Sequence, residues 1–234
     1  MHHPQIKHTI DIFKHMAHDL PPLLPDVVKK EVEHALEHLE NDYTVGLEEV
    51  EDVVIGLGKK VWPYWKAFDE MLVFHQGQMG EKFLEGKMPL ELKKKYKLFK
   101  EHGGDYHDLR VGGPASFFEP EDRQKFAEIL VDVDNELRQY VRQSVLSGER
   151  KKYEELIVDL QTVLDDIEKR LGHLRTVAED EEEHPQLAAE IRAQVRAFEF
   201  GLCLLGPRTK IHEVENADEH FQGRRKEKKI WGMK

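Results

Sequence analysis

The sequence predicts an all-α fold, an elongated antiparallel helical bundle of about six or seven helices with one glycine-rich loop over residues 102–118. Apolar residues recur in steps of three and four through most of the chain, which is the spacing of one face of a helix. Proline and glycine separate these stretches from one another. One stretch has about thirty residues and would span roughly 45 Å as a helix, so the bundle is expected to be elongated.

The first two helices are expected over residues 4–19 and 26–57. Pro21 and Pro22 end the first, because proline has no N–H to donate and clashes with the preceding turn. The second has a packing seam of the bundle or coiled-coil kind. Its seam residues alternate steps of four and three: Val32, Leu36, Leu39, Tyr43, Gly46, Val50, Val53 and Leu57.

The third helix is expected over residues 60–84, after Gly56 and Gly58. Its apolar stripe has one exception, because His75 stands where the period requires an apolar residue. A histidine in such a seam must be neutral and hydrogen-bonded, or charged and paired, since removing it from water is otherwise costly. We therefore treat His75 as either a satisfied core residue or a metal ligand.

The second half of the chain continues the pattern on both sides of the glycine-rich loop. Acidic residues after Glu119 suit the positive end of a helix dipole, and Gly148 ends that helix. The next stretch has an unbroken seam and is followed by the acidic run at residues 179–183. The helices are expected over residues 88–101, 119–147, 149–180 and 188–205.

Charge limits the classes of partner. Lys plus Arg number 35 and Asp plus Glu number 46, giving a net charge of −11. Such a chain is not expected to bind DNA in general or anionic membranes. We expect a single helical domain over residues 1–221 and a basic tail over residues 222–234, which either docks on RNA or an acidic partner or is a solvated end.

The single cysteine excludes an intrachain disulfide and suits a reducing compartment. Cys203 has leucine neighbours and is expected to be a buried apolar residue. No run approaches the ~20 apolar residues that a membrane helix needs. We expect a cytoplasmic protein without a membrane segment.

The glycine-rich loop is the first candidate for a working site, because it concentrates side chains that bind metals and anions. We expect a divalent transition metal (Fe, Mn or Zn) to be bound where this loop meets His75. Arg110 would hold an anionic group of a substrate through its planar fork. The candidate metal ligands are His75, His102, Asp105, His107 and Asp108.

Two further sets have helical spacing that allows chelation, although an exposed polar face explains each of them as well. The first set is His8, Asp11, His15 and His18, spaced three, four and three residues apart. The second is His212 with Glu215. Both are secondary candidates for a metal site.

No Walker or dinucleotide loop, Cys-x-x-Cys, His-Glu-x-x-His or Gly-x-Ser-x-Gly motif occurs in the chain. Two hypotheses therefore stay open. The first is a metal-binding helical bundle, either without catalytic activity or as a metal-dependent enzyme, with its His/Asp site at the loop. The second is a non-catalytic helical scaffold or protein-interaction module that oligomerises through its seams, for example as a homodimer.

Overall fold

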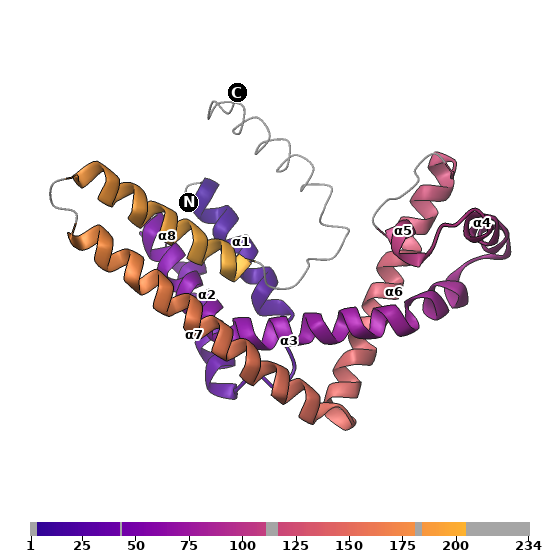
Figure 1. Cartoon of the computed structure of the whole chain (residues 1–234), viewed down its shortest axis with the longest axis horizontal. Helices are drawn as coiled ribbons and strands as arrows, with labels where there is room; N and C mark the ends of the chain where they lie inside the picture. Colours follow the sequence, from indigo (N-terminus) through magenta and orange to yellow (C-terminus); the bar gives the residue numbers. More distant parts are fainter. Residues whose placement is uncertain (1–3, 43, 111–116, 181–183, 205–234) are drawn as a thin grey trace. The chain divides into compact units, whose positions relative to one another are not determined.

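The computed structural model describes residues 4–42, 44–110, 117–180 and 184–204. This part of the chain contains eight α-helices and no strand, which confirms the all-α fold (Figure 1). None of these helices is long and apolar enough to cross a membrane. The described residues divide into two compact units, one formed by residues 4–71 with 142–204 and the other by residues 72–141.

The first unit contains α1 (Pro4–His18), α2 (Asp26–Asn41), the first part of α3 (Leu47–Lys87), α7 (Arg150–Asp180) and α8 (Pro185–Leu204). Its main core forms because the apolar stripes of α1, α2 and α3 face one another, with Phe13, Leu39 and Trp65 almost fully buried. A smaller cluster joins α3, α7 and α8. α7 and α8 lie side by side as an antiparallel hairpin (Figure 1).

The prediction of one helix over residues 26–57 is wrong, because the helix stops at Asn41 and a new one begins at Leu47. Asp42 explains the stop. Its side chain accepts hydrogen bonds from the Thr44 backbone N–H (2.9 Å) and hydroxyl (2.6 Å), a local turn that competes with helix continuation.

α3 also runs through the expected break at Gly56 and Gly58, and past Pro63. Packing against α8 accounts for the glycine at position 58, whereas a Cβ added at Gly56 would have no neighbour within 4 Å. A Cβ added at Gly58 would lie 2.5 Å from the Cβ of Cys203 on α8, so only glycine permits this approach of the two helices. The apolar contacts of α3 with α8 therefore outweigh glycine's low helix propensity of about 1 kcal/mol.

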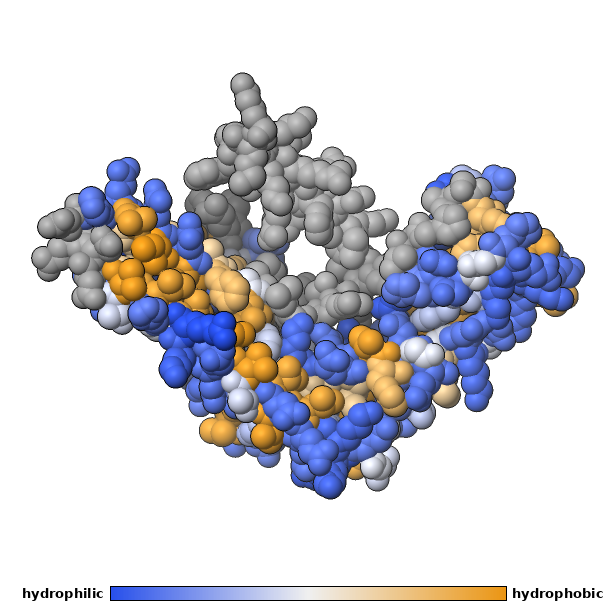
Figure 2. Space-filling model, in the orientation of Figure 1, coloured by the Kyte–Doolittle hydropathy of each residue, from blue (hydrophilic) through white to orange (hydrophobic). Residues whose placement is uncertain are grey.

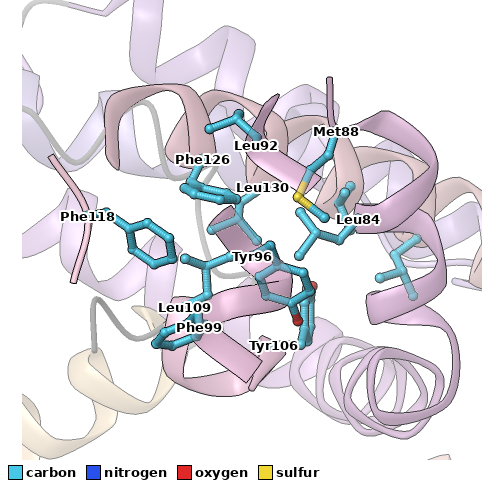
Figure 3. Packing of buried hydrophobic residues seen from close by; sticks show 12 residues of the cluster. Leu84, Met88, Leu92, Tyr96, Phe99, Tyr106, Leu109, Phe118, Phe126 and Leu130 are labelled. Atoms are coloured by element: carbon cyan, nitrogen blue, oxygen red, sulfur yellow. The ribbon is translucent and has the colours of Figure 1, made fainter. Parts of the chain in front are cut away.

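The second unit contains the rest of α3, α4 (Leu90–Glu101), α5 (Tyr106–Arg110) and most of α6 (Pro120–Ser147). Aromatic rings dominate its core, as Figure 3 shows. The Phe118 ring lies 4.8 Å from Phe126 and 5.1 Å from Phe99, centroid to centroid. Tyr106 of α5 packs against Gly80 of α3, where an added Cβ would lie 2.6 Å from the ring.

The loop predicted over residues 102–118 is not continuous. Residues 106–110 form the short helix α5, which the two glycine pairs flank rather than interrupt. Gly103 has φ 88°, a conformation that favours glycine, and the chain turns there between α4 and α5. Residues 111–116 lie outside the described part of the chain.

The boundary between α6 and α7 agrees with the sequence prediction. Gly148 separates α6 from α7, and the N–H groups of Gly148 and Glu149 both donate to the Ser144 carbonyl at 2.8 Å. α7 spans Arg150–Asp180 and α8 spans Pro185–Leu204, and the residues that directly follow each of these helices lie outside the described part of the chain. The boundary expected between the body and the basic tail, at residue 221, lies outside the described residues.

Candidate functional site

Asp105 and Asp108 cap α5. The Asp108 N–H donates to the Asp105 carboxylate at 2.8 Å, and the Asp105 N–H donates to the Asp108 carboxylate at 3.1 Å. This reciprocal arrangement satisfies two backbone donors that the first turn of a helix leaves without a partner. Both carboxylates therefore have a structural role, which the Asp-x-x-Asp spacing could have indicated.

His102 lies at the other end of the turn, just after α4. Its Nδ1 donates to the Leu98 carbonyl at 2.8 Å, and its ring centroid lies 5.5 Å from that of Phe117. The hydrogen bond satisfies one of the last carbonyls of α4. His107 is exposed on α5.

Arg110 pairs with Asp134 of α6. Two guanidinium nitrogens reach the two carboxylate oxygens, at 2.9 and 3.0 Å, and both side chains are about four-fifths buried. This is the bidentate geometry that arginine forms with a carboxylate. In this arrangement the fork that we expected to hold a substrate anion is occupied by a residue of the chain itself.

His75 is buried, with 5% of its surface exposed, as a seam position requires. Its ring makes edge contacts with Phe74 and Tyr140, each at 5.3 Å between centroids. Over the described residues, no three His, Cys, Asp or Glu side chains gather closely enough to hold a metal ion. The metal site at His75, His102, Asp105, His107 and Asp108 stays a prediction.

The secondary candidates are only partly described. His8 and His18 are exposed on α1, and Asp11 is half-buried. The side chain of His15, and both His212 and Glu215, lie outside the described part of the structure.

A buried charge cluster joins α3, α7 and α8, and the sequence pattern did not reveal it. The Glu199 carboxylate, 6% exposed, accepts from Lys59 at 2.5 Å and from Arg175. Lys59 also contacts Glu168 at 2.9 Å. Burial disfavours the charged form of Glu199, but the hydrogen bonds from Arg175 and Lys59 outweigh this, so the pKa of the carboxyl lies below its ordinary value.

Cys203 is not a nucleophile in this structure. It is 2% exposed, and burial raises the pKa of its thiol to about 12. A neutral buried thiol lacks the thiolate that nucleophilic chemistry requires. This agrees with the expectation of a small apolar core residue.

An apolar groove of about 500 Å³ lies along the α7–α8 hairpin of the first unit. Ile167 and Phe198 line one end, Leu174 and Ile191 the other, and Arg170 with Gln194 lie between them. Phe198 is 52% exposed and Leu174 is 43% exposed. Figure 2 shows apolar surface along this hairpin.

Comparison of the chain with protein-family models, with curated proteins and with solved structures found no match. Function therefore has to be argued from the groove and the charges of this chain.

Proposed function

We propose that the chain is a non-catalytic helical scaffold that self-associates, with a second copy packing on the open side of the α7–α8 hairpin. The observation that carries this proposal is the exposed apolar groove along the hairpin. Exposed apolar side chains that line one groove mark a candidate interaction surface.

The apolar stripe of α7 is wider than the face that α7 buries. Leu164 and Leu171 face the interior, whereas Val163 and Leu174 lie beside them and are 49% and 43% exposed. Val163 and Leu174 are eleven residues apart, close to three helical turns, so both lie on one line along α7.

α8 repeats this arrangement. Ala188, Val195 and Leu202 are buried, whereas Leu187 and Phe198 are 45% and 52% exposed. These two exposed residues are again eleven positions apart and so share one line along the helix. The hairpin thus has an open apolar side on both of its helices, as one half of a four-helix bundle does.

Charge favours a second copy as the occupant. The chain carries a net charge of −11, so two copies repel each other over most of their surface. The two hairpin helices themselves carry a small net charge of 8 − 10 = −2, because α7 carries six basic and eight acidic residues and α8 carries two of each. Closed dimers in which both copies use the same patch are also the commonest oligomers.

Substitution in the groove tests this proposal. Phe198→Glu and Leu174→Glu place a charge in the apolar contact and should shift the protein to monomer, as measured by light scattering over a range of concentrations. Val158→Glu is the matched control, because Val158 is 65% exposed on the opposite side of α7. A dimer that survives both groove substitutions would contradict the proposal, and circular dichroism shows whether each variant is folded.

The metal-binding hypothesis is tested by elemental analysis of protein purified without added metal. The scaffold proposal predicts less than one metal ion per chain, with no change in His75→Ala or His107→Ala. One equivalent of Fe, Mn or Zn that is lost in both variants would instead support a metal site.

A further inference from the structure

We infer that residues 211–221 pack as a helix into a groove between α2 and α3 of the same chain. The groove has a volume of about 570 Å³ and lies in the first unit. It is a different surface from the α7–α8 groove, so the inference does not depend on the proposed self-association. Packing of this segment would also place the start of the basic tail, at residue 222, beside α2 and α3.

The groove between α2 and α3 has an apolar floor that the described residues leave open. Ala35, Val53 and Leu57 line it, and Leu57 belongs to the core that α2 and α3 share. Val27 also lines the groove and is 63% exposed. The groove is therefore the outer side of a packed helix pair, a surface on which the apolar face of a further helix can pack.

α8 runs beside this groove and brings the segment that follows it close by. Arg196 of α8 donates a hydrogen bond of 2.8 Å to Asp52, which lines the groove. Near the end of α8, the Cys203 Sγ lies 3.5 Å from the Ile55 carbonyl oxygen. Residues 205–210 can span up to roughly 20 Å, whereas a helix is only about 10 Å wide. The segment that begins at residue 211 is therefore within reach of the groove.

The sequence of residues 211–221 predicts a helix with one apolar face. Ile211, Val214 and Phe221 are separated by three and seven residues, a spacing that places them on the same side of a helix. As a helix this face is roughly 15 Å long. The part of α3 that lines the groove, residues 52–60, is about 12 Å long, so the two lengths match.

Charge complementarity favours the same segment. Asp218 stands seven residues after Ile211 and therefore lies on the face that would meet the groove. The acidic side chains of the groove already have basic partners, which are Arg196 for Asp52 at 2.8 Å and Lys60 for Glu31 at 2.6 Å. Lys30 lines the groove, is exposed and makes no ion pair with a described residue. It is the cation available to Asp218.

Covalent attachment favours this segment over a second copy at the same groove. A segment tethered by a short linker meets the groove at an effective concentration on the order of 1 mM, whereas a second copy has to associate from dilute solution. Coverage by the tethered segment is therefore independent of protein concentration, and coverage by a second copy is not.

The reactivity of an introduced thiol measures whether the groove is covered. Val27→Cys places a reporter in the groove, and Val158→Cys places one on α7 with nearly the same exposure in the described structure, 63% against 65%. Cys203 is 2% exposed and should stay unreactive while the chain is folded. We expect the groove reporter to react with N-ethylmaleimide at least about tenfold more slowly than the α7 reporter, at every protein concentration.

Substitutions within the segment show whether it provides the cover. Val214→Asp with Phe221→Asp puts two charges on the apolar face and should raise the rate of the groove reporter to that of the α7 reporter. His212→Asp with Asn216→Asp is the matched control, because it adds two charges on the opposite, polar side of the same helix. The control pair should leave the groove reporter protected.

Three results would overturn the inference. The first is a groove reporter that reacts as fast as the α7 reporter in the otherwise unmodified chain. The second is an equal rate in the two pairs of segment variants. The third is protection that disappears on dilution, which would assign the groove to a second copy. A failure of self-association through the α7–α8 groove, in contrast, would leave all these rates unchanged.

Discussion

Gly58 lies where α3 and α8 approach so closely that no side chain fits between them. Gly58→Ala would place a Cβ 2.5 Å from the Cβ and 2.6 Å from the Sγ of Cys203, so one helix has to move. We expect a loss of about 1 to 3 kcal/mol in the free energy of unfolding, measured by urea denaturation.

Gly56→Ala is the matched control, because it lies in the same helix and an added Cβ has no neighbour within 4 Å. That change should leave stability unchanged or raise it by up to ~1 kcal/mol. Equal effects of the two substitutions would show that close packing at Gly58 is not what the glycine provides.

Glu199 forms ion pairs with Lys59 and Arg175 inside the first unit, and its contribution to the free energy of unfolding should depend on pH. Glu199→Gln keeps the shape but leaves two cations without their shared anion, which should cost about 3 kcal/mol near pH 7. The pKa of Glu199 is lower in the folded than in the unfolded state, so the folded state binds fewer protons and the contribution is lost as pH falls through the folded pKa.

The difference in unfolding free energy between the unmodified chain and Glu199→Gln should therefore be constant above the ordinary glutamate pKa and shrink below it. Urea denaturation at a series of pH values measures this difference. A difference that grows as pH falls would contradict the assignment of the charged form to Glu199.

For single residues, the sequence predicted which side chains are buried better than it predicted which charged side chains pair with one another. His75 and Cys203 are buried, as the seam position of the first and the leucine neighbours of the second indicated. The pairing of Lys59 with Glu199 could not be predicted, because the two residues are 140 positions apart and periodicity says nothing about which charged residues meet. The capping roles of Asp105 and Asp108 were missed because the run was interpreted as a loop.

Among the elements, the long helices of the second half were the most predictable, because their seams are unbroken and glycine or proline marks their ends. The break between α2 and α3 was missed for a physical reason. Leu39 and Val50 are eleven residues apart, about three turns, so both are buried in phase although Asp42 and residues 44–46 are not helical. Periodicity reports which face is buried and does not show that the helix is continuous.

The short helix α5 should depend on its caps. Asp105→Ala removes the acceptor for the Asp108 N–H and should cost about 1 kcal/mol of stability, measured by urea denaturation. Glu101→Ala is a nearby control at an exposed position whose contact with Lys97 is 4.0 Å long. If Asp105→Ala leaves stability unchanged but removes a bound metal, the carboxylate is a ligand and its capping role is secondary.

For the whole molecule, the spacing of apolar residues predicted an all-α protein and gave no function. The charged residues of the expected site are used in capping and ion pairs, whereas the open side of the α7–α8 hairpin retains exposed apolar side chains. Exposure of this kind could not be predicted from the seams alone, because the seam of α7 looks the same whether one or two neighbours cover it.

Sedimentation equilibrium of the whole chain tests the central claim most directly. The account predicts a mass that rises with concentration from 27.4 kDa toward twice that value, and a Phe198→Glu variant that stays at 27.4 kDa while Val158→Glu behaves like the unmodified chain. A constant mass of 27.4 kDa at every concentration, in a protein that circular dichroism shows to be folded, would contradict it.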